Sequence, residues 1–194
     1  MNARTALLPV LLAAQLVALL SFSVQPVDDA ARRSVQALRR PWLELPMHLV
    51  TDSGRPLLVA GTVVAVGAGA VGRAVLLETA IVLLPVNLVV EGLKRATFRT
   101  RPDGSHRREN AAFPSSHAAN AFAVAVVLAR RWRRAWPAWF ALALAVAFSR
   151  LYLDRHWLSD VVAGALMGAG LAIVVLRSWM RWLRSRVPVS PAAA

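Results

Sequence analysis

Long apolar segments constrain this chain more than any other feature of its sequence. A helix needs about 20 apolar residues, with a range of roughly 17 to 25, to cross the hydrocarbon core of a bilayer. Six segments reach that length, alone or with their flanking residues: 5–24, 56–72, 74–93, 118–128, 136–153 and 157–176. The sequence therefore predicts an all-α integral membrane bundle of six transmembrane helices, with residues 1–194 forming a single domain.

Composition and charge agree with a membrane environment. Of the 194 residues, 57% are hydrophobic and 17% are charged, an unusual balance for a soluble globular protein. The formal net charge is +13, and the arginines cluster between the apolar segments, where they can meet anionic lipid headgroups. We therefore expect membrane lipids as neighbours and no nucleic-acid partner, because no soluble module presents the charge. The absence of cysteine excludes disulfides and thiolate metal sites.

A further helix is predicted at residues 27–40, within the loop 26–55 that follows the first span. Its apolar residues recur at helical spacing with arginines beside them: Val27, Ala31, Val35 and Leu38. An apolar stripe that is flanked by basic residues is typical of a helix that lies in the membrane interface. We therefore expect an interfacial helix after the first span.

The two ends of the chain bear on its topology. The segment 5–24 follows a lone basic residue, Arg4, and residues 21–23 resemble the small-residue site at which signal peptides are cleaved. The segment is longer than the apolar core of a usual signal peptide, so a retained helix is the preferred interpretation. The arginine cluster at 130–134 and the basic tail after residue 176 favour cytoplasmic N- and C-termini.

Three polar motifs interrupt the apolar pattern. The first, residues 94–102, opens a loop of about 20 residues, a length that marks a functional candidate in a compact protein. The second, residues 114–117, leads into the fourth span, and the third, residues 149–160, joins the fifth span to the sixth. Because an even number of crossings separates the motifs, all three should reach the same membrane face.

The basic and hydroxyl residues of these motifs suit a phosphoryl group. Lys94, Arg101 and Arg150 offer positive charge and forked N–H donors to its nonbridging oxygens. Ser115 and Ser116 follow a proline, and such helix starts present unpaired backbone N–H groups to an anion. No cofactor or metal is required, and we expect chelators to leave the activity unchanged, because no carboxylate cluster suits Mg²⁺.

Two histidines and a carboxylate complete the predicted site. His156 and Asp160 are four residues apart, which places them on one face if both are helical. A carboxylate that accepts the N–H of one ring nitrogen fixes the tautomer and leaves the other nitrogen as a nucleophile. His117, from another helix, can then protonate the leaving oxygen and later activate water.

Together the motifs resemble the three-part signature of the type 2 phosphatidic acid phosphatase (PAP2) superfamily. Their spacing is Lys94, six residues and Arg101-Pro102; then Pro114-Ser115-Ser116-His117; then Ser149-Arg150, five residues, His156, three residues and Asp160. The third residue of the second motif is usually glycine in that family and is Ser116 here. The resemblance implies a phosphohistidine at His156, with Asp160 orienting it and His117 as general acid. It also implies a phosphate-binding set: Lys94, Arg101, Ser115, Ser116 and Arg150.

The resemblance implies a metal-independent phosphatase that acts on a lipid phosphate or diphosphate. Candidate substrates are polyprenyl diphosphate, phosphatidic acid and phosphatidylglycerol phosphate. Similarity to bacterial family members implies a site on the extracytoplasmic side of the inner membrane. Two alternatives stay open, namely a phosphotransferase with a lipid or sugar hydroxyl as acceptor, and a non-catalytic lipid-binding protein. The intact His117, His156 and Asp160 argue against the second, because binding alone needs only the cations.

Overall fold

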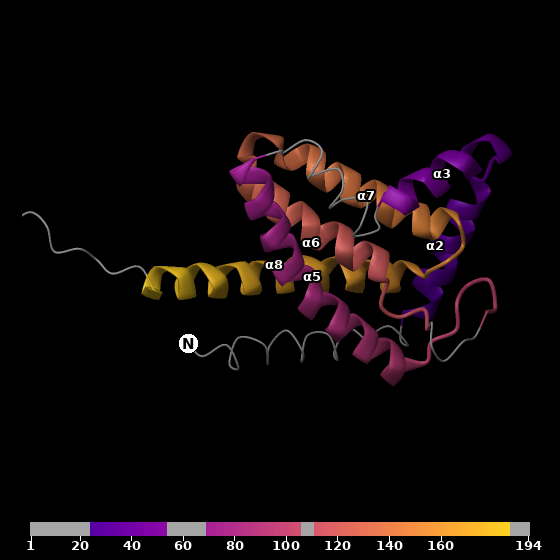
Figure 1. The fold of residues 1–194 in the computed structure, drawn as a ribbon. Coiled ribbons are helices and arrows are strands. Elements are labelled where there is room, and N and C mark those ends of the chain that lie inside the picture. Colours follow the sequence, from indigo (N-terminus) through magenta and orange to yellow (C-terminus); the bar gives the residue numbers. More distant parts are fainter. Residues whose placement is uncertain (1–23, 54–68, 106–110, 187–194) are drawn as a thin grey trace, which may run out of the picture.

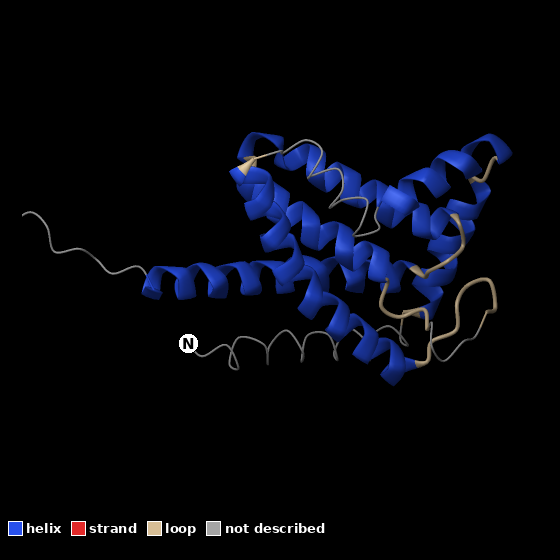
Figure 2. Ribbon diagram, in the orientation of Figure 1, coloured by secondary structure: helices blue, strands red, loops and turns tan. Residues whose placement is uncertain are grey.

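The structure is a computed structural model that describes residues 24–53, 69–105 and 111–186. Figure 1 shows the helices in chain order, and Figure 2 shows that the described part contains helices and loops but no strand. The α-helices are α2 (Gln25–Ala37), α3 (Pro41–Ser53), α5 (Ala70–Thr97), α6 (Ser116–Arg131), α7 (Trp136–Tyr152) and α8 (Leu158–Arg186). A short 3-10 helix, η2 (Arg133–Ala135), joins α6 to α7. The predicted all-α fold is confirmed.

Four of the predicted spans coincide with helices of the structure. α5, α8 and the stretch Arg133–Tyr152, which joins η2 to α7, are long and apolar enough to cross a membrane. α6 has 16 residues, and at 1.5 Å per residue its length of about 24 Å is less than the ~30 Å hydrocarbon core. The predicted spans 5–24 and 56–72 lie outside the described residues, apart from Val24 and residues 69–72.

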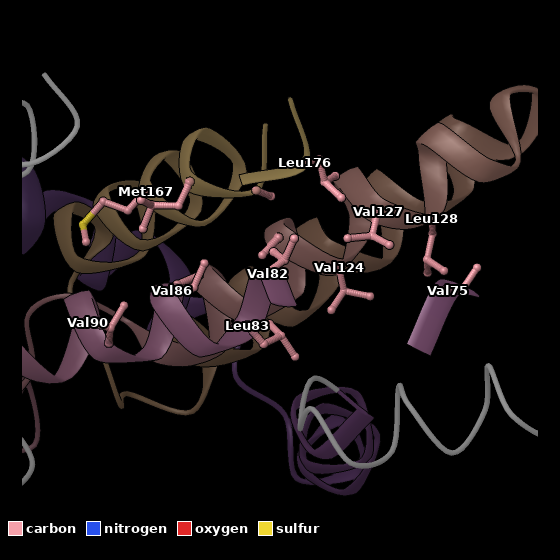
Figure 3. Close-up of a cluster of buried hydrophobic side chains, with 14 residues drawn as sticks. Val75, Val82, Leu83, Val86, Val90, Val124, Val127, Leu128, Met167 and Leu176 are labelled. Atoms are coloured by element: carbon pink, nitrogen blue, oxygen red, sulfur yellow. The ribbon is translucent and has the colours of Figure 1, made fainter. Parts of the chain in front are cut away.

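α6 lies at the centre of the bundle, in contact with α5, α7 and α8. Valines, leucines and alanines of α5, α6 and α8 form one buried cluster between these helices, which Figure 3 shows in close-up. Val82 and Val86 of α5, for example, are completely buried there. Large apolar side chains on the outer faces, such as Leu84, Leu88 and Leu166, are more than 60% exposed. An apolar outer surface of this kind suits lipid tails rather than water.

The helix ends that carry the three motifs meet at one end of the bundle. α5 ends and α6 begins at this end of the bundle. α7 also ends there and α8 begins there, next to α2 (Figure 1). The N–H of Ser115 donates to the carbonyl oxygen of Asp160 at 3.0 Å, which joins the starts of α6 and α8. The three motifs therefore converge, as their order along the chain predicts.

Two glycines allow α8 to approach the backbone of α6. A Cβ atom at Gly164 would overlap the carbonyl oxygen of Ser115, and one at Gly168 would overlap that of Ala119. Small residues at this spacing are common where membrane helices pack closely. Gly164 therefore also sets the position of the residue that precedes α6.

We expect Gly168→Ala to lower the free energy of unfolding by about 1 to 3 kcal/mol, because the new methyl group meets backbone that cannot rotate away. The midpoint of thermal unfolding in detergent measures this effect. Gly170→Ala is the matched control, since no atom lies within 4 Å of a Cβ placed there. Because alanine favours helices over glycine, Gly170→Ala should keep or raise the midpoint. Equal midpoints for the two variants would contradict the close approach.

The segment after the first predicted span forms two helices rather than one. α2 covers most of the predicted interfacial helix 27–40, whereas α3 occupies residues that were expected to be loop. Pro41 at the start of α3 suits the first turn of a helix, where no N–H bond is lost. Pro46 lies inside the same helix. A proline at that place argues for a loop in sequence analysis, and this explains the wrong expectation.

α2 turns the side that carries Asp28 to the rest of the protein. Asp28 is only 1% exposed, whereas Val27 and Leu38 are both 57% exposed. Arg32 and Gln36, one and two turns after Asp28, donate hydrogen bonds to the end of α7 and the loop that follows it. Of the predicted apolar stripe, Val27 and Leu38 are thus left on the outside, where a helix in the membrane interface would meet lipid, whereas Ala31 and Val35 are partly buried.

Candidate active site

Seven side chains line a cavity of about 220 Å³ at the end of the bundle where the motifs meet. They are Lys94, Arg101, Ser116, His117, Arg150, Arg155 and His156. Six of them are predicted site residues, and Arg155 is an addition. The two other predicted residues, Ser115 and Asp160, are completely buried and do not line the cavity.

Ser115 is the N-cap of α6. Its side-chain oxygen accepts a hydrogen bond from the N–H of Ala118, the pattern that satisfies a free donor in the first turn of a helix. The predicted helix start at the second motif is confirmed. Ser116 and His117 form the first turn and line the cavity, so the cap holds them at the site. A direct contact of Ser115 with phosphate stays a prediction.

The cavity is cationic. Four basic side chains line it, one of them being Lys94 in the last turn of α5, and no carboxylate is among its lining residues. Arg150 is 8% exposed, and its Nη1 donates to the Oγ1 of the buried Thr51 at 2.7 Å. Nη1 of Arg101 donates to the carbonyl oxygen of Arg155 at 2.9 Å. Guanidinium groups held in this way are oriented to bind the oxygens of a phosphoryl group.

The ring of His156 has a hydrogen-bond partner that the sequence did not indicate. Its Nδ1 lies 2.8 Å from the carbonyl oxygen of Ala112. A carbonyl oxygen can only accept, so Nδ1 carries the proton and the lone pair of the neutral ring is on Nε2. The carboxylate of Asp160 lies farther away, with its Oδ2 3.6 Å from Nδ1. The expected helical turn is absent, because α8 begins at Leu158, after His156.

Burial keeps the His156 ring neutral. Burial is the largest cause of a shift that lowers the pKa of His156 from 6.5 to about 4, and the positive charges of Arg150 and Arg101 contribute to it. Asp160 acts in the opposite direction but does not outweigh them. At neutral pH the lone pair of Nε2 is therefore present without the need for another base.

Asp160 is held by groups other than histidine. Its Oδ2 accepts from the N–H of Trp157 at 2.9 Å, as an acidic residue in the first turn of a helix commonly does. Its Oδ1 accepts from Nη1 of Arg99 at 2.7 Å. Arg99 lies inside the first motif, of which only Lys94 and Arg101 were predicted to act. Its contacts with Asp160 and Asp28 reveal this role, which its residue type does not indicate in so basic a chain.

A larger hollow lies at the opposite end of the bundle and has a different character. It has a volume of about 670 Å³ and is lined by four apolar residues and four arginines of α6 and α8: Val126, Ile173, Leu176, Met180, Arg130, Arg177, Arg181 and Arg184. These lining residues include no histidine, serine or carboxylate that could act as nucleophile or general acid. The smaller cavity, which is lined by His117, Ser116 and His156, is therefore the candidate site for the chemistry.

Comparison with known proteins identifies the family. Residues 73–184, which contain all three motifs, match the family model described as PAP2 superfamily. This chain belongs to the PAP2 superfamily.

Relatives with assigned activities are phosphatases of lipids. Phosphatidylglycerophosphatase B of Bacillus subtilis (strain 168) is 28% identical over 169 residues, which cover 79% of this chain and 83% of the relative. Lipid A 4'-phosphatase of Bacteroides thetaiotaomicron is 43% identical over 58 residues, 29% of this chain and 26% of the relative. As a PAP2 enzyme, the chain hydrolyses phosphoric esters.

Solved structures share the fold. The crystal structure of the transmembrane PAP2-type phosphatidylglycerolphosphate phosphatase from Bacillus subtilis matches with a TM-score of 0.69 at 23% identity, covering 94% of this chain and 98% of that one. Aquifex aeolicus LpxE matches with a TM-score of 0.66 at 21% identity, covering 75% and 92%. Together with the three long apolar helices of the described part, these matches confirm an integral membrane protein.

Proposed function

We propose that this PAP2 protein, as a single domain, hydrolyses lipid phosphates without a metal ion and through a phosphohistidine on His156. The observation that carries the proposal is the hydrogen bond from Nδ1 of His156 to the carbonyl oxygen of Ala112, which leaves the Nε2 lone pair available. His156 lines a cavity with four cationic side chains, which would hold the negative oxygens while the nitrogen attacks phosphorus.

The proposed reaction has two steps. In the first, Nε2 of His156 forms a bond to phosphorus, the bond from phosphorus to the lipid oxygen breaks, and His117 gives its proton to that oxygen. In the second, His117 takes a proton from water as the water oxygen attacks phosphorus, and the phosphorus–nitrogen bond breaks. Asp160 stabilises the positive charge that develops on the ring of His156. Lys94, Arg101, Ser116 and Arg150 bind the nonbridging oxygens, and Ser115 supports them as the cap of α6.

Among lipid phosphates, phosphatidylglycerol phosphate is the first candidate, because the relative that aligns with most of the chain is a phosphatidylglycerophosphatase. Polyprenyl diphosphate and phosphatidic acid are the others. The proposed location is the extracytoplasmic side of a bacterial inner membrane. The arginines of η2 and of the C-terminal turns of α8 support it, since they lie at the end of the bundle away from the motifs, and basic loops favour the cytoplasm.

Release of inorganic phosphate from a panel of lipid phosphates tests this function. Purified protein in mixed micelles should release phosphate from at least one of the three candidates, at a rate that EDTA leaves unchanged. Loss of activity in EDTA that Mg²⁺ restores would contradict the metal-independent mechanism. Release from none of the lipids would contradict the hydrolase.

The same assay separates hydrolysis from phosphotransfer. If water is the acceptor, the phosphate released equals the substrate consumed, whatever hydroxyl compound is added. A transferase would instead consume substrate with little free phosphate and label an added lipid or sugar alcohol. A protein that only binds lipid would consume no substrate at all.

A further inference from the structure

A buried ion-pair network lies next to the cavity and involves only one predicted site residue. Nη1 of Arg99 is 2.7 Å from Oδ1 of Asp160, and its Nη2 is 2.7 Å from Oδ2 of Asp28. The three residues are 7%, 0% and 1% exposed, respectively. The two arms of one guanidinium group thus join α2 to α8.

Both carboxylates also satisfy backbone donors where α8 begins. Asp28 accepts from the N–H of Ser159 at 2.8 Å and from its hydroxyl at 2.6 Å. Asp160 accepts from the N–H of Trp157 at 2.9 Å. The first N–H groups of a helix have no partner within the helix, so these bonds fix its start. His156 precedes this turn directly and depends on it for its position.

Two further polar side chains of α2 are attached to the end of α7 and the loop that precedes α8. The guanidinium of Arg32 donates to both carboxylate oxygens of Asp154 at 2.8 and 2.6 Å. The side-chain amide of Gln36 donates to the carbonyl oxygens of Leu151 and Tyr152 at 3.1 and 3.2 Å. α2 therefore binds the segment between Arg150 and His156 at three of its residues, and Arg99 connects α2 to the carboxylate beside the histidine.

We infer that Arg99 is a positioning residue: by bridging Asp28 and Asp160 it compensates the charge of Asp160 beside His156 and fixes the start of α8 to α2. The inference rests on the proposed function, because it concerns the state of the proposed nucleophile. Arg99 does not line the cavity and acts on the substrate only through Asp160 and His156.

The physical reason is the balance of charge around His156. Asp160 faces the ring from α8, while Arg150 from α7 and Arg101 from the preceding loop face it with positive charge. Other groups that line the same cavity are Lys94 of α5, His117 of α6 and Arg155. A carboxylate 3.6 Å from Nδ1 favours the protonated ring, whose Nε2 carries a proton and cannot attack phosphorus. An arginine on the far oxygen of that carboxylate weakens this effect.

Arg99→Gln tests the inference in the protein without substrate. ¹⁵N NMR of histidine-labelled protein in detergent follows protonation of the His156 ring, which is assigned by comparison with His156→Gln. In Arg99→Gln the ring should take up its proton at a pH higher than in the wild type by about one unit or more. The acid limb of kcat/KM should move in the same direction, since the ionisation of the substrate is common to both proteins. An unchanged titration would overturn the inference.

Arg32→Gln is the matched control. Arg32 and Arg99 both lie over the ring of Trp157, each with its guanidinium carbon 5.8 Å from the ring centre, but Arg32 pairs with Asp154 and not with Asp160. Its loss should loosen the loop and leave the titration of His156 unchanged. An equal shift in Arg32→Gln would attribute the effect to the loosened loop and would refute the role of Arg99.

Arg99→Lys separates charge from bridging and serves even if Arg99→Gln does not fold. One ammonium group keeps the positive charge but lacks the fork that reaches two carboxylates. The titration of His156 should then resemble that of the wild type, while kcat falls by about 10-fold or more because the ring is less well positioned. Wild-type kcat in Arg99→Lys would show that the bridge is not needed.

The two proposals fail in different ways. Wild-type protein that releases no phosphate from any lipid phosphate contradicts the proposed function. The NMR titration needs no substrate and no turnover, so its result decides the role of Arg99 separately.

Discussion

Replacement of His156 by alanine should lower the rate of phosphate release by about a thousandfold or more, because the nitrogen that would bond to phosphorus is lost. Among the other residues that line the cavity, Ser116 is assigned to phosphate binding and His117 to proton transfer, so neither is expected to replace the lost nitrogen. The measurement is phosphate release from the best lipid of the panel, at matched amounts of folded protein.

His48→Ala is the control for this change. His48 is an exposed histidine of α3 to which neither the sequence nor the structure gives a role. It should keep wild-type turnover and the same unfolding midpoint. Substantial turnover in His156→Ala would remove the assignment of the nucleophile, whatever the state of the other site residues.

The transmembrane part of the fold is predictable because a bilayer imposes a simple rule on length and polarity. α5, α7 and α8 follow from that rule. The start of α6 is predictable for another reason, because a proline followed by serines is a strong local signal at Ser115. α3 does not follow from the rule, because Pro46 argues against a helix, whereas contacts with α7 stabilise one there. Local signals identify helices whose stability is local, and miss those that depend on packing.

The candidate site divides in the same manner. Side chains that must face the substrate carry their chemistry in their residue type, and six of the eight predicted residues line the cavity. The groups that hold these side chains in place cannot be recognised by residue type. The carbonyl oxygen of Ala112 is a backbone group that any residue could supply, and Thr51 belongs to the unexpected helix. Arg99 is one of many arginines in a basic chain, so only its contacts distinguish it.

The orientation of α2 could not be predicted for a related reason. An amphipathic pattern defines two faces, but the pattern alone does not say which face meets the protein. In water the apolar face would turn inward, whereas at a membrane surface lipid can cover it. Asp28 then turns inward at little cost, because it accepts hydrogen bonds from Arg99 and Ser159. The side of α2 that supports the site therefore carries Asp28 together with the partly buried Ala31 and Val35.

Replacement of His117 by alanine should separate the two steps of the proposed reaction. With an aryl phosphate such as p-nitrophenyl phosphate, the leaving group departs without a proton, so the first step continues. The second step loses the group that activates water and should slow by about 10²- to 10⁴-fold.

The expected result for His117→Ala is a burst of p-nitrophenol followed by slow turnover, with phosphate bound to the protein. A phosphorus–nitrogen bond is stable in base and labile in acid, so the label should survive alkali and be lost in acid. The double variant His117→Ala, His156→Ala should carry no label. A label that persists in the double variant would assign the intermediate to another residue. A slow variant with neither burst nor label would instead favour direct attack by water on the lipid phosphate, in which His156 would bind the phosphoryl group without forming a bond to it.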